Sequence, residues 1–161
     1  MTQKERKKRG RKVVVLNPFN VVEENQWQWN PLDYIRPEEF ERDSRIIIEG
    51  LLEPETPYNQ HFYKIAADIL QVTLEVIQNT MPKEDFNLNT LYDFVCGPEF
   101  INQLKIWAKH PDFLEGRPAK MASTILSAGE EERGSFLTTI KRNLSWVGYE
   151  KNKAFLQPCN D

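Results

Sequence analysis

Residues 58–79 have the sequence YNQHFYKIAADILQVTLEVIQN, the longest amphipathic stretch of the chain. Its inward positions recur at spacings of three and four residues, which places them on one face of an α-helix. These positions are Phe62, Ile65, Ala66, Ile69, Leu70, Thr73, Val76 and Ile77. A helix of this length rises roughly 30 Å, enough to cross a small domain. The stretch therefore predicts the central helix of a helical fold.

Similar patterns on either side predict further helices, separated by proline and glycine. The expected helices span residues 44–52, 58–79, 90–96, 98–110, 118–146 and 149–156. Asp43 and Asn89 are the expected N-caps of the first and third helices, and Pro98 is the expected first residue of the fourth. Residues 128–134 hold two glycines and three consecutive glutamates, which predict a kink or break in the fifth. We therefore predict an all-α fold, a compact helical bundle of about five to seven helices.

The N-terminal region departs from this pattern. Residues 12–16, KVVVL, are followed by Asn17 and Pro18 and predict a short β-strand. An apolar strand without polar alternation belongs inside a sheet that is covered on both faces. No second stretch of this kind occurs in the sequence, so we expect the rest of that sheet outside this chain.

These patterns divide the chain into three parts. Residues 1–16 form a basic lead-in and strand, and residues 17–42 form an irregular connecting segment with several large aromatic residues. Residues 43–157 are the expected all-α domain.

The charge of the chain is unevenly distributed. Residues 1–12 carry seven lysines and arginines and one glutamate, although the net charge of the 161 residues is −3. The remainder is therefore acidic, and an acidic body repels the phosphates of nucleic acid. We expect such a body to favour a basic protein partner.

The apolar pattern and the cysteine spacing both indicate the compartment of the chain. No apolar run approaches the roughly 18 residues of a membrane span, and no signal-peptide pattern follows the N-terminus. The two cysteines, Cys96 and Cys159, are far apart in the sequence and are expected as free thiols in a reducing compartment. We therefore expect a soluble, cytoplasmic chain.

Catalytic and cofactor patterns are incomplete. Residues 129–135 have the outline of a phosphate loop, but the lysine that must follow the second glycine is absent and three glutamates would face the phosphates. His61 and His110 have no cysteine or histidine at metal-ligand spacing. We expect no catalytic residue, metal site or cofactor in this chain. An active site assembled only in space stays an alternative.

Two surfaces are candidate binding sites. Glu130, Glu131, Glu132 and Arg133, together with Glu53 and Glu55, form a possible patch for a basic protein partner, with a plain solvated face as the alternative. Lys4, Arg6, Lys7, Lys8, Arg9 and Arg11 are possible DNA contacts, with a solvated charge run as the alternative.

Residues 12–19, KVVVLNPF, and 29–36, WNPLDYIR, resemble coupling ATPases of type IV secretion systems, the TraG/TraD/TrwB family. In that family a strand of the motor core ends in an NP(F) turn, and a (W/Y)NPL segment leads into an inserted all-α domain. The resemblance covers nearly the whole chain. Asn17, Pro18, Asn30, Pro31 and Leu32 match the motif positions, and we interpret them as structural.

The resemblance implies that the orphan strand comes from a parent α/β motor domain. It also implies that the nucleotide-binding motifs and a membrane anchor in the bacterial inner membrane belong to other parts of a hexameric parent, so ATPase activity is not expected here. The inserted domain would receive substrates at the cytoplasmic mouth of the motor: a secreted effector protein, an adaptor or chaperone, or a relaxase with its DNA. The isolated domain is expected to be a monomer.

We expect one of two functions for this chain. The first is substrate recognition by the all-α domain, by binding alone. The alternative is a DNA-binding module that uses the basic N-terminal arm.

Deletion of residues 1–16 should leave the helical body folded, because the apolar stripes of the expected helices all follow residue 43. Circular dichroism at increasing temperature should show one cooperative transition, as in the full chain. A broad, gradual loss of helical signal in the shortened protein would contradict this.

Overall fold

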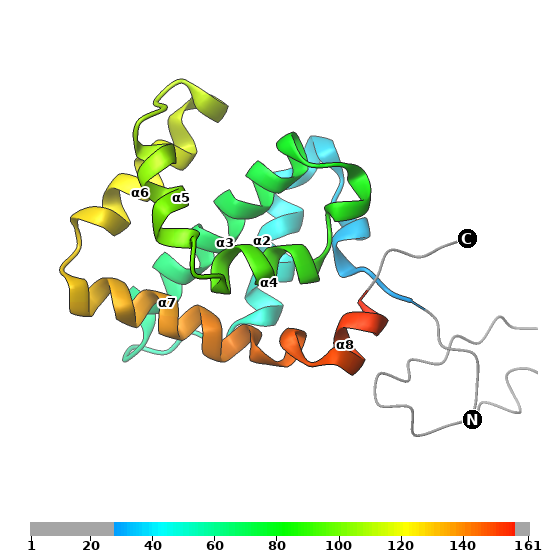
Figure 1. Ribbon diagram of the computed structural model, residues 1–161. Helices are drawn as coiled ribbons and strands as arrows, with labels where there is room; N and C mark the ends of the chain where they lie inside the picture. The colour runs from blue at the N-terminus through cyan, green and yellow to red at the C-terminus, as the bar shows by residue number, and fades with distance from the viewer. Residues whose placement is uncertain (1–27, 157–161) are drawn as a thin grey trace, which may run out of the picture.

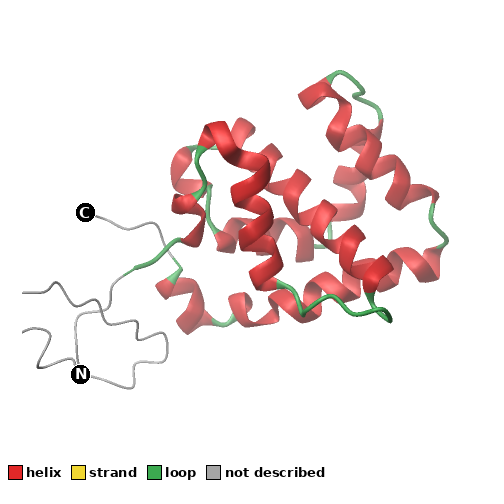
Figure 2. Cartoon of the chain, turned by 180° about the vertical axis from the view of Figure 1, so that it is seen from behind, coloured by secondary structure: helices red, strands yellow, loops and turns green. Residues whose placement is uncertain are grey.

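The computed structural model describes residues 28–156, which form a bundle of seven α-helices joined by short turns (Figure 1). The helices are α2 (Phe40–Leu51), α3 (Gln60–Thr80), α4 (Leu88–Cys96), α5 (Phe100–Ala108), α6 (Arg117–Ser127), α7 (Glu130–Leu144) and α8 (Glu150–Phe155). Figure 2 shows helices and loops, and no strand, over this range. The predicted all-α bundle is confirmed. The strand expected at residues 12–16 lies outside the described residues.

Helix α3 is the centre of the bundle. Its side chains Ile69, Leu70, Leu74 and Ile77 are fully buried. Helices α2, α4, α6 and α7 all pack against it. The stripe predicted from the sequence is thus the inner face of the central helix, and burial of large aliphatic side chains there is the main source of stability.

The first helix begins earlier than the sequence indicates, at Phe40, because a 3-10 turn at Pro37–Glu39 leads directly into it. Asp43 therefore is not the N-cap, and that prediction is wrong. Its nearly buried carboxylate instead accepts hydrogen bonds from Arg36 Nε at 2.8 Å and Arg36 Nη2 at 3.0 Å. The side-chain hydrogen bond from Arg36 is the first cause that lowers the pKa of Asp43, from 3.8 to about 2. The pair fastens the connecting segment to α2.

Two further helix starts differ from the sequence prediction. The N-cap of α4 is Asn87, whose side chain accepts a hydrogen bond from Thr90 N at 2.9 Å. Asn89 lies inside the helix and is buried, and it donates to the backbone oxygen of Lys153 at 3.0 Å. Pro98 precedes α5 by two residues, in the turn that joins it to α4. Both predictions are wrong by two residues: Asn87 caps α4, and Phe100 begins α5.

The predicted break in the long C-terminal stretch is confirmed. Ala128 and Gly129 have extended backbone conformations, with ψ of 148° and 154°, and separate α6 from α7. Glutamates fill the first turn of α7, where negative charge is favoured by the helix dipole.

The turn between α5 and α6 has an unusual backbone. Leu114, Glu115 and Gly116 all have positive φ, at 46°, 57° and 77°. A side chain on Gly116 would also bring a Cβ within 2.7 Å of the Pro111 carbonyl oxygen. Arg117 holds the end of this turn, because its guanidinium pairs with Glu75 of α3 and with Glu115.

The two ends of the described region lie side by side (Figure 1). Trp29 N donates to the Phe155 carbonyl oxygen at 2.9 Å, and the two aromatic rings lie 6.1 Å apart. Asn89 adds a further contact here, because its side-chain amide donates a hydrogen bond to the backbone of α8. The chain thus enters and leaves the bundle at one place.

Two isoleucines on α2 test the burial pattern. Ile48→Ala should lower the free energy of unfolding by about 2–5 kcal/mol, because its side chain is fully buried. Ile46→Ala, on the exposed side of the same helix, should change it by at most about 0.5 kcal/mol. Urea unfolding measures both. Equal effects would show that α2 is packed in a different rotation.

The Arg36–Asp43 pair predicts a pH dependence of stability. A carboxylate whose native pKa is about 2 rather than 3.8 stabilises the fold above about pH 4, and that contribution is lost as the pH falls toward 2. Asp43→Asn should therefore lower the melting temperature at neutral pH, and the difference from the unaltered chain should shrink between about pH 4 and pH 2. Glu41→Gln, at an exposed position of the same helix, is the control. A pH-independent difference would contradict the assignment.

Candidate functional site

A polar groove of about 390 Å³ lies between the α2–α3 connection and helix α7. We call it the α7 groove. Glu53, Asn59 and Tyr63 line one side, and Glu131, Gly134 and Arg142 of α7 line the other. The two walls come from segments about 80 residues apart in the sequence; they meet because the first runs into the start of α3 and α7 packs on α3.

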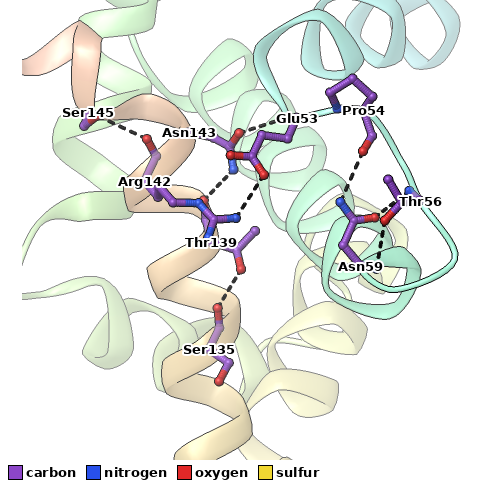
Figure 3. Close-up of polar contacts among 9 residues, drawn as sticks. All are labelled: Glu53, Pro54, Thr56, Asn59, Ser135, Thr139, Arg142, Asn143 and Ser145. Atoms are coloured by element: carbon purple, nitrogen blue, oxygen red, sulfur yellow. Dashed lines mark hydrogen bonds and ion pairs between the residues drawn. The ribbon is translucent and has the colours of Figure 1, made fainter.

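The loop that forms the first wall is held by its own side chains (Figure 3). Asn59 Oδ1 accepts a hydrogen bond from Thr56 N at 2.7 Å, and Asn59 Nδ2 donates to the Pro54 carbonyl oxygen at 3.1 Å. Thr56 Oγ1 accepts from Asn59 N at 3.3 Å. Local side-chain bonds of this kind stabilise a turn without regular structure, so the wall has a defined shape.

Exposed hydrogen bonds between Glu53 and the end of α7 tie the two walls together. Glu53 N donates to Asn143 Oδ1 at 2.8 Å, and Arg142 Nη2 donates to the Glu53 carboxylate at 3.1 Å (Figure 3). Asn143 Nδ2 in turn donates to the Thr139 carbonyl oxygen within α7, at 2.8 Å. The groove is therefore formed before any ligand binds.

The four residues of the predicted acidic surface on α7 have different surroundings in the structure. Glu131 lines the groove, whereas Glu132 pairs with His61 Nε2 at 2.8 Å. The ring of His61 also lies 5.5 Å from that of Phe136. Arg133 is half-buried, with Nη1 3.5 Å from the Leu126 carbonyl oxygen. Glu130 is exposed at the helix start.

Tyr63, which lines the groove, is influenced by the charges of nearby residues. Burial is the first cause that raises the pKa of the Tyr63 hydroxyl, followed by the negative charges of Glu49 and Glu55, while Arg45 acts in the opposite direction. The structure places Glu53 and Glu131 in the lining of the α7 groove and leaves Glu55 outside that lining. It also adds Asn59, Tyr63, Arg142 and Asn143, which no sequence motif marked.

The motif residues Asn30, Pro31 and Leu32 lie in the packed start of the domain. All three are buried, and Asn30 Oδ1 accepts a hydrogen bond from Leu32 N at 3.2 Å. Asn30 Nδ2 donates to the Phe86 carbonyl oxygen at 2.8 Å, which fixes the segment beside α4. The other sequence candidates lie outside the described residues: Asn17, Pro18, Lys4, Arg6, Lys7, Lys8, Arg9 and Arg11.

A second hollow, of about 620 Å³, lies between the end of α3 and α5. Its lining is more apolar and includes Met81, Phe94, Ile106 and Trp107. Ile106 is half-exposed there. This hollow lacks the concentration of carboxylates that marks the α7 groove.

Several kinds of chemistry find no support in residues 28–156. No group of three or more His, Cys, Asp or Glu side chains in this range is placed to hold a metal ion. The segment with a phosphate-loop outline is helical from Glu130 onward. Cys96 is a free thiol, and burial is the first cause that raises its pKa to about 11, which makes it a poor nucleophile. None of the helices in the described range is long and apolar enough to cross a membrane.

The described part of the chain is therefore an all-α domain with a preformed polar groove and a motif-bearing segment at its entry. The chain belongs to the family of type IV secretory system conjugative DNA transfer proteins, whose model matches residues 1–157. This confirms the resemblance to coupling proteins, while the inserted position of the domain remains a prediction. Comparison with curated proteins and with solved structures finds no match.

Proposed function

We propose that the helical body of this chain is the substrate-recognition domain of a type IV secretion coupling protein. Its partner is a secreted effector protein, an adaptor or chaperone, or a relaxase. The observation that carries the proposal is the preformed α7 groove, whose walls are tied by bonds from Glu53 to Asn143 and Arg142, on a member of this family. A groove that needs no ordering suits binding, because little conformational entropy is lost when a partner docks.

The proposed role is binding without catalysis. A parent motor, hexameric and anchored in the bacterial inner membrane, would supply the energy, and the domain would sit at its cytoplasmic mouth as a monomeric unit. The adjacent entry and exit at Trp29 and Phe155 support this arrangement, because a domain inserted into a parent fold must leave near the point where it enters.

Charge favours a protein partner over naked DNA. Residues 28–156 hold 20 acidic side chains against 14 lysines and arginines. Two carboxylates, Glu53 and Glu131, line the groove with one cation, Arg142, so its lining has a net negative charge that would repel a phosphate backbone.

DNA binding remains a second candidate function, because of the basic residues Lys4 to Lys12 and because the family is one of conjugative DNA transfer. In this case the arm would neutralise phosphates while the helical body plays no part in affinity. Affinity would then fall steeply with salt.

A pull-down with the purified full chain tests the two functions against each other. The lysates are from cells that carry a type IV secretion system and from matched cells that lack it, and labelled single- and double-stranded DNA are offered in parallel. We expect a protein partner from the first lysate alone, retained at about 200 mM salt, with little DNA. DNA binding that disappears when residues 1–12 are deleted, with no protein partner, would favour the alternative.

A further inference from the structure

Two aromatic side chains are exposed close to the place where the chain enters and leaves the bundle. Trp146, in the 3-10 turn that follows α7, is 37% exposed, and Tyr149, directly before α8, is 68% exposed. We call these two residues the aromatic corner. Helix α8 is only about 9 Å long, and Phe155 at its end bonds to Trp29. The aromatic corner is therefore one short helix away from the entry of the chain.

The backbone of the aromatic corner is held in place. Val147, between the two rings, is fully buried, and Asn152 Nδ2 donates to the Trp146 carbonyl oxygen at 2.6 Å. Gly148 packs so closely on Tyr92 that an added Cβ would lie 2.6 Å from the Tyr92 hydroxyl oxygen. The corner thus presents two rings to solvent from a fixed backbone.

The polar atoms of the two rings have no partner among the described residues. Within residues 28–156, neither the indole N–H of Trp146 nor the hydroxyl of Tyr149 makes a hydrogen bond. An indole N–H donates, and a tyrosine hydroxyl both donates and accepts, so both can bond to the backbone of an extended segment. Aromatic rings with such polar ends are common in contact surfaces.

The charge around the aromatic corner is opposite to that of the domain as a whole. Residues 141–153 carry four basic side chains and one acidic side chain, whereas residues 28–156 hold more acidic than basic ones. Two of these four basic side chains are paired with carboxylates from other parts of the bundle. Lys141 and Lys151 have no ion-pair partner among the described residues. A negatively charged segment would compensate them.

The part of the chain directly before the described region has this complementary chemistry. Residues 17–27 have the sequence NPFNVVEENQW, with two glutamates and no lysine or arginine. Four of their side chains are large and apolar: Phe19, Val21, Val22 and Trp27. The chain emerges at Trp29, beside the end of α8. Eleven extended residues span up to about 35 Å, so the segment can reach across the length of α8.

We propose that residues 17–27 of this chain pack on the aromatic corner and form the outer edge of the helical domain. The apolar side chains of the segment cover the rings of Trp146 and Tyr149, and its two glutamates compensate Lys141 and Lys151. The contact sets the direction in which the chain leaves the bundle toward its N-terminal part. It concerns a segment of the chain itself and does not depend on the proposed function.

Single-stranded nucleic acid is the competing occupant, because exposed aromatic rings beside lysines can stack on bases and pair with phosphates. The chain's own segment is favoured for two reasons. It is tethered next to the corner, which gives it an effective concentration on the order of millimolar. It also carries both the apolar side chains and the negative charge that the corner lacks.

Hydrogen–deuterium exchange measured by mass spectrometry tests the contact in three chains: the full chain, one without residues 1–16 and one without residues 1–27. The amides of residues 145–151 should exchange equally in the first two chains and about fivefold faster in the third, because only the third lacks the segment. Amides of α6, away from the corner, should exchange equally in all three. Equal exchange of residues 145–151 in all three chains would overturn the proposal.

A substituted full chain separates the contact from an effect of shortening. Val21→Ser combined with Val22→Ser keeps the Trp29–Phe155 bond within a continuous chain, yet it should also accelerate exchange of residues 145–151, because the segment loses apolar contact. Faster exchange in the shortened chain but not in this variant would overturn the proposal, since loss of the chain end would then be the cause.

Thermal unfolding gives an independent test with a matched pair of tyrosines. Tyr149→Ala should lower the melting temperature of the full chain by about 3 °C, and by less than about 1 °C in the chain without residues 1–27. Tyr58→Ala, at another exposed tyrosine, should leave both chains unchanged. An equal effect of Tyr149→Ala in both chains would contradict the contact, because the ring would then act within the bundle alone.

The competing occupant is tested with labelled single-stranded DNA and the chain without residues 1–16, in which the basic arm cannot contribute. No binding that depends on Tyr149 is expected. DNA binding that is lost in Tyr149→Ala would overturn the proposal, because the aromatic corner would then be open to nucleic acid.

Discussion

Helix α3 is buried over most of its length, and four other helices cover it. A helix that is apolar on more than one side needs several neighbours, so the positions of α2, α4, α6 and α7 follow from this one element. The connecting turns then take the conformation that joins those helices. Between α5 and α6 this places Leu114 and Glu115 at positive φ, a conformation that costs about 1–3 kcal/mol per residue and is sustained by the packing around it.

Periodicity was sufficient to predict the class of fold, the central helix and the break before α7, because these depend on where apolar residues and glycines occur along the chain. The exact helix starts depended on contacts that sequence does not display. Asp43 and Asn89 have the chemistry of N-caps, yet Arg36 and the backbone of α8 engage their side chains. The groove could not be predicted from the sequence, because Glu53 and Asn143, which are bonded beside it, are 90 residues apart and neither belongs to a recognisable motif.

The distribution of charge connects the fold to the proposed role. Glutamates suit the first turn of α7 for local reasons, since they compensate the helix dipole. The packing of α7 on α3 places Glu131 in the α7 groove with Glu53. A residue that stabilises the start of the helix therefore also adds negative charge to the groove. The chain belongs to the conjugative DNA transfer family, and the proposed role in substrate recognition assigns this groove a use within it.

The adjacent entry and exit of the bundle have a mechanical consequence. A force that separates the two connecting segments acts first on the Trp29 N to Phe155 O hydrogen bond and on the ring contact beside it. This hydrogen bond and this ring contact would break before the force reaches α3, which is not joined directly to either segment. Because Phe155 and Leu156 belong to the hydrophobic core and Trp29 packs against it, breaking this contact would open one edge of the core.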